Sequence, residues 1–405
     1  MIDTPFEIQL ENTTGSAVEN IPIFNPAMVL PLANAGTTYR FITPYAVSYT
    51  ANQQLRVTQN SVDLYSITTG VSTPAEVAVL LTTLTGDTWI VVSSVSGGNV
   101  WTVTSATNVY TFFQIYALEA IASGTVQNLY DIIFDDINTG FICGQNGTVL
   151  KTKDSGVSWS SIGFSSATEL RGIASAGASY TYIYVCGDGG MIRKADKRAN
   201  WGILTSGTVQ NLRSISFCSD DDGIVCGTNA VIRYTINGSD WLTPDSIPDG
   251  VVFNVIKYFS RSFALVGSTD SLNNVGVLLK STNRGRDWSV ITLPSIFPVI
   301  DIYIASNTVA YVAVSSTDGL EAYIYKTVDS GSNWTVLFTA PNIVKFANIY
   351  SDANIYFIGG KNLYYYNGSN IYQIGADDAG RNELYFINLK LGFTIDDNGL
   401  IKKYE

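Results

Sequence analysis

Thr152-Lys153-Asp154-Ser155-Gly156-Val157-Ser158-Trp159 is the stretch that decides the fold, because it recurs along the chain. A second full copy spans Thr327 to Trp334, and a third, from Ser281 to Trp288, has Asn in place of the Asp. Degenerate copies end at Trp201 and Trp241. From the first copy onward these Trp residues lie 42, 40, 47 and 46 positions apart. The chain is therefore a tandem repeat.

Each repeat contains short apolar segments separated by turn residues, such as 129–134, 141–144 and 149–152 ahead of the first copy. A period of this length with four strands is typical of one blade of a β-propeller. The sequence therefore predicts an all-β dominated fold, with a seven-bladed propeller of four-stranded blades over residues 111–405. The blades are expected to start near Leu129, Leu170, Leu212, Asn254, Val299, Lys345 and Glu383.

The seventh repeat ends one strand short, because residues 400–405 supply only its third strand. We expect the missing outer strand at residues 113–121. The segment from Ser123 to Leu129 is repeated from Ser206 to Leu212, and the second copy directly follows an outer strand that begins at Trp201. A strand placed before the first copy would pair the bare edge of the last blade and join the two ends of the chain.

The repeated pattern Ser/Thr-x-Asp-x-Gly-x-x-Trp is the Asp box. Its Asp is expected to accept hydrogen bonds from the N–H groups of a tight turn, its Gly to supply a positive φ, and its Trp to pack between blades. Metal binding or catalysis by these Asp residues is the disfavoured alternative, and we expect no metal and no cofactor. The structural positions are Thr152, Asp154, Gly156, Trp159, Asp196, Trp201, Trp241, Ser281, Asn283, Gly285, Trp288, Thr327, Asp329, Gly331 and Trp334.

Residues 1–110 do not follow the repeat. They are predicted to form a small β-rich α+β domain that serves as an anchor or oligomerisation module. One helix is expected near residues 73–84, where Thr73 is an N-cap, Pro74 takes the first helical position and Glu76 the third, ahead of an apolar run.

The composition excludes several classes of function. The chain has no His, which removes the usual general base and most zinc sites. Its 23 Lys and Arg against 34 Asp and Glu give a net charge of -11, which disfavours nucleic acid as a partner. We expect no membrane span and no secretory signal. Cys143, Cys186 and Cys226 recur at one position in successive repeats, which indicates a tight strand contact rather than a disulfide.

From Gly140 to Trp159 the repeat resembles the photosystem II assembly-factor-like and sortilin-like group of Asp-box (BNR-type) propellers. The resemblance implies the fold, whereas propellers of this kind host unrelated binding roles. Bacterial sialidases also carry Asp boxes, but their Phe/Tyr-Arg-Ile-Pro motif does not occur here. Arg171 and Arg213 begin adjacent first strands and could hold an anion, while Val255 and Ile300 stand where a third arginine would be needed. A sialidase-like glycosidase is the remote alternative, and we expect no enzyme.

The first domain loosely resembles amino-terminal regions of virion-associated phage proteins in its order of strands, helix and hairpin. That resemblance implies a head decoration, spike, fibre or tail-associated component, which assembles in the host cytoplasm with other virion proteins. It also implies a homo-oligomer or large assembly, with a host-surface ligand as a further candidate partner.

The alternative is a cellular, cytoplasmic assembly-factor-like propeller whose open face holds another polypeptide. In a propeller, the loops between second and third strands and the links between blades form the face that usually binds. Two long loops of this kind carry the candidate binding residues Asp270, Asn273, Asp318 and Glu321.

Overall fold

The computed structural model describes residues 119–404 except for positions 178–179, 248–250, 271–274, 317–320, 341–343, 353, 360–361, 367, 370, 377–382 and 389–390. Before residue 119 it describes the backbone of the strands. The chain divides into two compact units: residues 1–119 with 372–375 and 404–405, and residues 120–371 with 376–403. None of the helices in the described parts has the length and hydropathy of a membrane-spanning segment.

The described strands of the first unit form two four-stranded sheets and one two-stranded pair. Their bounds are β1 (Glu7–Gln9), β2 (Glu11–Asn12), β3 (Asn20–Pro22), β4 (Ala27–Val29), β5 (Thr37–Pro44), β6 (Gln54–Gln59), β7 (Val62–Thr68), β8 (Thr88–Ser93), β9 (Gly98–Ser105) and β10 (Tyr110–Ile115). The sheet orders are β4-β10-β6-β7 and β2-β5-β9-β8, and the pair is β1-β3. The helix predicted near residues 73–84 lies outside the described residues.

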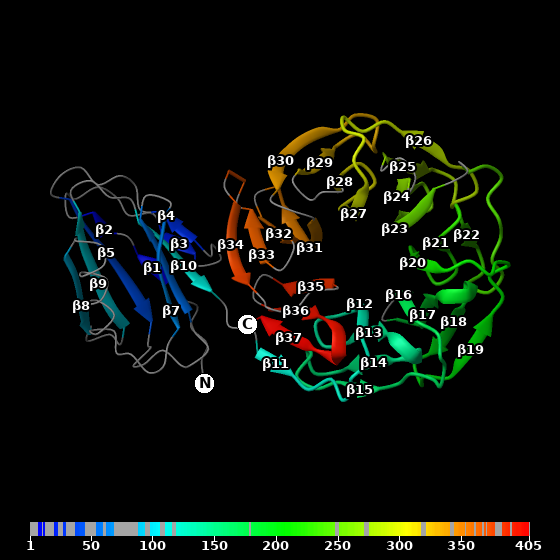
Figure 1. Ribbon diagram of the computed structural model, residues 1–405, viewed down its shortest axis with the longest axis horizontal. Coiled ribbons are helices and arrows are strands. Elements are labelled where there is room, and N and C mark those ends of the chain that lie inside the picture. Colours follow the sequence, from blue (N-terminus) through cyan, green and yellow to red (C-terminus); the bar gives the residue numbers. More distant parts are fainter. Residues whose placement is uncertain are drawn as a thin grey trace. The chain divides into compact units, whose positions relative to one another are not determined.

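The second unit contains seven sheets in a ring around a central axis (Figure 1). This confirms the predicted seven-bladed propeller. The first three blades consist of β12 (Leu129–Phe134), β13 (Gly140–Gly144), β14 (Val149–Thr152) and β15 (Ser160–Ser161); β16 (Leu170–Ala176), β17 (Tyr182–Gly187), β18 (Ile192–Asp196) and β19 (Trp201–Leu204); and β20 (Leu212–Phe217), β21 (Gly223–Gly227) and β22 (Ile232–Thr235).

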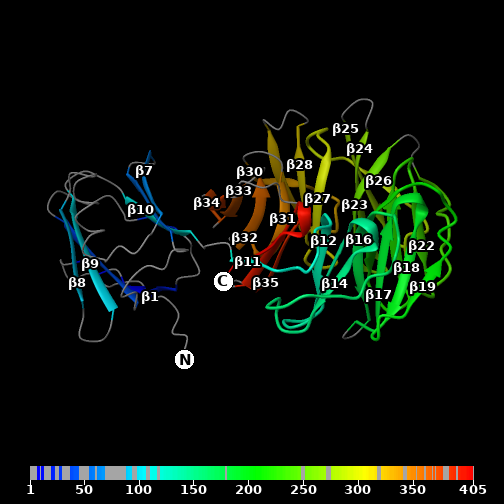
Figure 2. The same cartoon turned by 60° about the horizontal axis from the view of Figure 1, so that its bottom comes forward.

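In every blade the strand named first lies innermost, and the inner strands β12, β16 and β27 run across the thickness of the ring (Figure 2). Blades 4 to 6 consist of β23 (Val252–Ser260), β24 (Phe263–Asp270), β25 (Val275–Ser281) and β26 (Ser289–Ile291); β27 (Val299–Ile304), β28 (Ala310–Ser315), β29 (Ala322–Thr327) and β30 (Thr335–Ala340); and β31 (Val344–Ser351), β32 (Asn354–Gly359), β33 (Asn362–Tyr366) and β34 (Ile371–Ala376). Blade 7 consists of β35 (Glu383–Asn388), β36 (Leu391–Ile395), β37 (Ile401–Tyr404) and β11 (Glu119–Ile121). Short 3-10 helices link second to third strands at Gln145–Gly147 (η1), Asp188–Gly190 (η2) and Asp397–Gly399 (η3).

The outer strand of blade 7 is shorter than the sequence predicted. β11 begins at Glu119, and the predicted start at Phe113 is wrong. Phe113 belongs to β10, where it pairs with Arg56 of β6 and Ala27 of β4. Because both edges of β10 are paired within the first unit, this strand has no edge left for blade 7.

The second strands β13, β21 and β28 are buried along their whole length, and β17, β32 and β36 are buried after their first residue, because each lies between the first and third strands of its blade. This explains their continuous apolar runs. The recurring Cys are buried free thiols, and the Gly that follows each Cys allows the preceding link to pass close by. A Cβ at Gly144 would lie 2.2 Å from the Asn128 carbonyl oxygen, and one at Gly227 2.0 Å from that of Asn211.

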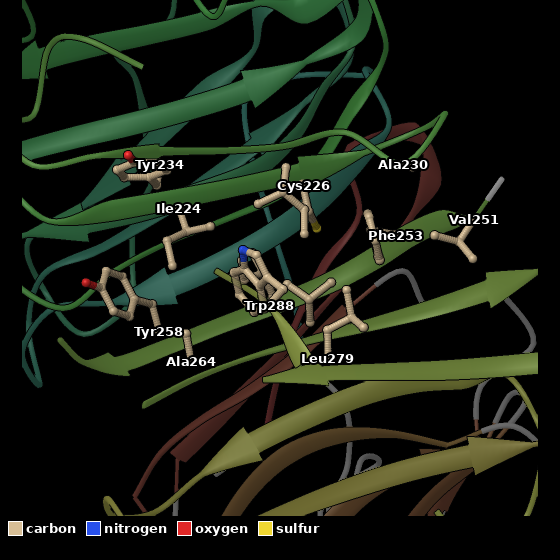
Figure 3. Packing of buried hydrophobic residues seen from close by; sticks show 13 residues of the cluster. Ile224, Cys226, Ala230, Tyr234, Val251, Phe253, Tyr258, Ala264, Leu279 and Trp288 are labelled. Carbon is tan, nitrogen blue, oxygen red and sulfur yellow. The ribbon is translucent and has the colours of Figure 1, made fainter. Parts of the chain in front are cut away.

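Large apolar side chains fill the interfaces between blades. Figure 3 shows the interface of blades 3 and 4, where Trp288 lies between Ile224 of blade 3 and Leu279 of its own blade. Trp288 is 7% exposed, and Ile224 and Leu279 are fully buried. Burial of such a side chain contributes roughly 1.5 to 3 kcal/mol. The repeat therefore needs its neighbours, since each blade covers one face of the next.

Blade 3 departs from the four-stranded plan. Its fourth strand is reduced to one bridge, in which Tyr234 and Leu242 exchange two backbone hydrogen bonds of 3.0 and 2.7 Å. The chain then leaves for the Asp box of blade 4, where Ser246 bridges to Asp287. The copy of the Asp box in blade 3 is one residue short, and the outer strand that follows it is correspondingly curtailed.

Candidate functional site

The innermost strands of five blades carry a bulge close to their start. A bulge leaves one residue out of the pairing register and turns its side chain to a new direction. The residues left out are Tyr130, Arg171, Arg213, Asn254 and Ile300, and we call them the rim. All five line a central cavity of about 780 Å³, which runs the length of β12 from Tyr130 to Phe134.

Arg171, predicted as an anion ligand, already has two carboxylate partners. Its Nη2 lies 2.6 Å from Glu169 Oε2 and its Nε lies 2.6 Å from Asp188 Oδ1. The hydrogen bond to Asp188 is the main cause that raises the pKa of Arg171. The charge of this guanidinium is therefore neutralised by residues of its own blade.

Arg213, the second predicted anion ligand, is exposed at the rim. Its Nη1 donates to Asn254 Oδ1 over 2.5 Å, and no ion pair among the described residues includes it. Partial burial lowers the pKa of Arg213, and the positive charge of Arg171 lowers it further. Since a guanidinium has five N–H groups, Arg213 retains donors for a carboxylate or a carbonyl of a partner.

The position after the rim residue links neighbouring blades. In three blades its side chain accepts the backbone N–H of the next blade's inner strand. These pairs are Asp131 Oδ2 with Ile173 (2.9 Å), Ser214 Oγ with Ile256 (3.3 Å) and Asp301 Oδ2 with Phe346 (2.9 Å).

Charged side chains from five blades meet in the cavity at and beyond this position. They are Asp131, Lys257, Asp301, Lys345 and Glu383. Lys345 Nζ lies 3.1 Å from Glu383 Oε2. Burial, and after it the negative charge of Glu383, raise the pKa of Asp131 to about 7. Burial also raises the pKa of Asp301 to about 6, against the opposing pull of Lys257.

The candidate binding residues of the two long loops stay untested. Asn273 and Asp318 lie outside the described residues, and Asp270 ends β24 with its side chain outside them. Glu321 is exposed, and its backbone N–H donates to Ser316 Oγ over 3.0 Å. Glu321 does not line the central cavity.

The three near-complete Asp boxes share one geometry. The N–H of the Gly donates to the hydroxyl that opens the box, over 2.9 Å in each copy. The donors and acceptors are Gly156 with Thr152, Gly285 with Ser281, and Gly331 with Thr327. These three Gly have φ of 78, 81 and 83°, the left-handed region that favours Gly.

The acidic or amide residue of each box caps the same turn. Asp154 Oδ1 accepts the N–H of Ser158 over 3.0 Å, Asn283 Oδ1 that of Asp287 over 3.0 Å, and Asp329 Oδ1 that of Asn333 over 2.9 Å. Hydrogen bonds led by those from Ser158 lower the pKa of Asp154 to about 2, and those led by the N–H of Asn333 lower the pKa of Asp329 to about 2. These side chains are fully engaged within their turns. In the degenerate copy, Asp196 Oδ1 accepts the N–H of Asn200 over 3.0 Å.

The Trp residues of the boxes lie in the blade interfaces. Trp159, Trp241, Trp288 and Trp334 are 7 to 8% exposed. Trp159 packs against Phe393 of blade 7, with ring centroids 6.3 Å apart. Trp201 is less buried, and its Nε1 donates to the carbonyl of Ile162 in blade 1 over 2.7 Å.

Sequence reasoning missed the charged residues of the cavity. Asp131 and Asp301 occupy the third position of the first strand in two repeats, and Lys345 and Glu383 stood out only as strand starts. A signal was present, because a charged residue at the equivalent inner position of several repeats must face the common axis.

Comparisons with known proteins agree with this architecture. Residues 193–381 match the family described as Photosynthesis system II assembly factor YCF48. A solved structure, "YCF48 bound to D1 peptide", is 17% identical with a TM-score of 0.56, over 71% of this chain and 94% of that one. YCF48 from Cyanidioschyzon merolae is 15% identical with a TM-score of 0.56, over 71% and 98%.

A third structure, the WD40 beta propeller domain of Doa1, is 15% identical with a TM-score of 0.56, over 72% of this chain and 97% of that one. At these identities the structural likeness shows the fold. Among curated protein sequences, none matches the chain. The second unit is therefore a seven-bladed Asp-box propeller similar to the photosystem II assembly factor YCF48 family.

Proposed function

We propose that the chain is a non-catalytic propeller of the assembly-factor type, which holds another polypeptide on its open face. The observation that carries this proposal is the match of residues 193–381 to the YCF48 assembly-factor family. One solved protein of the same fold is described as bound to a D1 peptide. That protein supports a polypeptide partner here, whereas the identity of the partner does not transfer.

The rim is the part of the open face best equipped for this role. Arg213 is exposed, and its remaining N–H groups suit the carbonyl and carboxylate oxygens of an extended peptide. The paired Arg171 beside it presents no such free charge. The partner is therefore expected to contact Arg213 and Asn254 before it reaches the cavity.

The test starts from a pool of 12-residue peptides with free carboxyl termini, incubated with the intact chain. Bound peptides are identified by mass spectrometry and their affinities measured by fluorescence polarisation. Arg213→Glu is expected to weaken binding by at least about tenfold, which corresponds to ~1.4 kcal/mol. Arg198→Glu is the matched control, because Arg198 is exposed on the Asp-box turn at the opposite end of its blade.

Equal peptide affinities for the two variants and the unchanged chain would show that the rim is not the peptide-binding surface. A pool from which no peptide is retained would overturn polypeptide binding altogether.

The comparisons favour this assembly-factor-like alternative over the virion component that the amino-terminal domain suggested. They do not show the phage resemblance of that domain. Partners in a virion, a homo-oligomer and a virion location stay predictions of the sequence. Sedimentation of the native material, with peptide mass spectrometry of particle, membrane and soluble fractions, tests them together.

A further inference from the structure

Beyond the rim, the charges that line the central cavity do not balance. The described lining has three carboxylates, those of Asp131, Asp301 and Glu383, and two ammonium groups, those of Lys257 and Lys345. Three negative charges against two positive ones leave the part of the cavity beyond the rim one positive charge short. Lys345 and Glu383 form a direct pair, so the shortage falls on Asp131, Asp301 and Lys257.

The rim does not make up this deficit. Arg171 and Arg213 add two positive charges at the rim, and the two carboxylates that pair with Arg171, those of Glu169 and Asp188, add two negative ones, so the count is unchanged. Within the described residues Lys257 forms no ion pair with either Asp131 or Asp301, although its charge acts on both. The charge of Lys345 acts on both as well, but Lys345 is paired with Glu383, so in the described part of the chain neither Asp131 nor Asp301 has an ammonium group of its own.

The structural role of Asp131 does not require a charge. Asp131 accepts the N–H of the next blade through Oδ2, and Ser214 does the same in blade 3 with a neutral hydroxyl. The second oxygen of Asp301, Oδ1, accepts the N–H of Ile302 over 2.8 Å. Asp131 Oδ1 has no hydrogen-bond partner within the described residues, and its side chain lines the cavity.

We propose that the central cavity binds one organic cation, an ammonium or guanidinium group, at Asp131. Such a group supplies the missing charge and several N–H donors for Oδ1. A metal ion is a poorer candidate, because among the described residues no three carboxylates or thiols converge as a metal site. The far end of the cavity is lined by Phe134, Phe217, Tyr303 and Tyr385, rings that accommodate an alkylammonium chain.

The same chemistry has two sources, a free amine or the side chain of a Lys or Arg in a polypeptide. The net charge of -11 draws both toward the molecule. The inference goes beyond the proposed function, and the two fail separately: peptide capture at the rim uses Arg213, whereas the cation site uses Asp131.

The first experiment titrates the intact chain with n-butylammonium at pH 8 and constant ionic strength, by isothermal calorimetry. One site is expected, with no binding of n-butanol or n-butyrate. Asp131→Asn keeps an oxygen for the N–H of Ile173 and removes the charge, so the affinity should fall at least tenfold. Asp245→Asn, at an exposed carboxylate away from the cavity, should leave it unchanged.

A second variant reverses the sign of the effect. Lys257→Gln doubles the charge deficit, so n-butylammonium should bind at least threefold more tightly. Damage to the fold would weaken binding in both variants, and only the charge deficit predicts opposite changes. Weaker binding to Lys257→Gln, or unchanged binding to Asp131→Asn, overturns the proposal.

The affinity should also depend on pH. Asp131 faces Glu383 and Tyr385 of β35, Lys257 of β23, Asp301 of β27, Lys345 of β31, Arg171 of β16 and the Cys143 thiol of β13. The cation binds the ionised carboxylate, so its affinity should fall by about tenfold per pH unit below the pKa of Asp131. In Asp131→Asn this dependence should be much reduced, and a dependence equal to that of the unchanged chain overturns the assignment.

A pair of peptides separates the two sources. Gly-Gly-Lys-Gly-Gly is compared with its norleucine counterpart and with n-butylammonium, in the unchanged chain and in Asp131→Asn. Binding of the Lys peptide that is lost in Asp131→Asn assigns the site to a polypeptide side chain. Binding of n-butylammonium alone assigns it to a free amine, and binding of neither overturns the proposal.

Discussion

The carboxyl group of Asp131 gives the propeller a pH-dependent stability. Its pKa rises from an ordinary value of 3.8 in the unfolded chain to about 7 in the fold, so the folded state holds the proton more tightly. The stability contributed by the protonated form is fully present below pH 4 and is lost as the pH rises toward 7.

Asp131→Asn is therefore expected to stabilise the propeller at pH 8, by on the order of 1 to 3 kcal/mol, since one pKa unit corresponds to about 1.4 kcal/mol. The gain should shrink toward pH 4, where the native side chain is neutral as well. Urea unfolding followed by Trp fluorescence at both pH values measures it, with Asp245→Asn as the control. A gain of the same size at both pH values would contradict the assignment.

Ala199 is a second residue whose local conformation has a measurable cost. It has a φ of 64° in the degenerate Asp box, whereas the full copy has a Gly in this conformation one position earlier, Gly156 with a φ of 78°. A left-handed conformation costs an L-residue about 1 to 2 kcal/mol. Gly avoids this cost, but part of the gain in stability is lost because Gly makes the unfolded chain more flexible. Ala199→Gly should therefore stabilise the fold by about 0.5 to 1 kcal/mol.

The control for this prediction is Ala305→Gly, an exposed Ala that does not have a positive φ. It should destabilise the fold by about 0.5 to 1 kcal/mol, because only the entropic term acts. The melting temperatures of both variants test this prediction, and shifts of the same sign for the two would contradict it.

At the level of the element, the Asp box depends on the hydroxyl that opens it. Thr152 is 1% exposed, and its Oγ1 accepts the N–H of Gly156 over 2.9 Å. Thr152→Val keeps the shape and leaves this buried N–H without its partner, so a loss of about 1 to 3 kcal/mol is expected. Thr152→Ser should be close to neutral, because Ser281 makes the same bond in blade 4. Chemical denaturation measures the free energy of unfolding of both variants, and equal values would contradict this role of the hydroxyl.

The repeats made most strands and turns predictable, and the bulges did not follow from them. Turn residues and apolar runs placed the first strands within two residues of their observed starts, as for Asn254 against Val252. A bulge has no distinct residue type in this chain: Tyr130, Arg213 and Asn254 all occupy it. Because a bulge changes which face the next residue takes, the inward direction of Asp131 and Asp301 could not be derived from simple alternation.

The length of the closing strand was unpredictable for a related reason. Residues 110–115 and 119–121 both carry apolar side chains suited to a sheet, and the sequence does not say which sheet each one joins. Arg171 and Arg213 both lie at the rim, and their role as anion ligands stays a prediction. The partners of Arg171 were missed because Asp188 lies on the following 3-10 helix, and only the folded blade brings the two together.

At the scale of the whole molecule, the ring is held closed by β11. Ile121 packs against the cluster of blades 7 and 1 that includes Phe393 and Trp159. Ile121→Asp places a carboxylate against this cluster and should open the closure. Backbone hydrogen exchange in residues 391–404 should then accelerate by at least about tenfold, the change expected for ~1.4 kcal/mol of local stability.

Ile121→Val is the matched control for the closure and should change exchange in this segment little. Exchange in β25, on the far blade 4, serves as the internal reference. Equal acceleration of β25 and residues 391–404 would mean that the ring opens as a whole, contrary to this prediction.

Because β11 pairs with β37, the ring cannot close during biosynthesis until the end of the chain has been made. Ile121 leaves the ribosome 280 residues before Ile401, by subtraction of their positions. At roughly 5 to 20 residues per second, β11 of the nascent chain therefore waits about 15 to 60 seconds for its partner strand β37. During that interval a neighbouring nascent chain on the same message can donate its own last blade, so dense polysomes favour exchanged dimers and slow, sparse translation favours monomers.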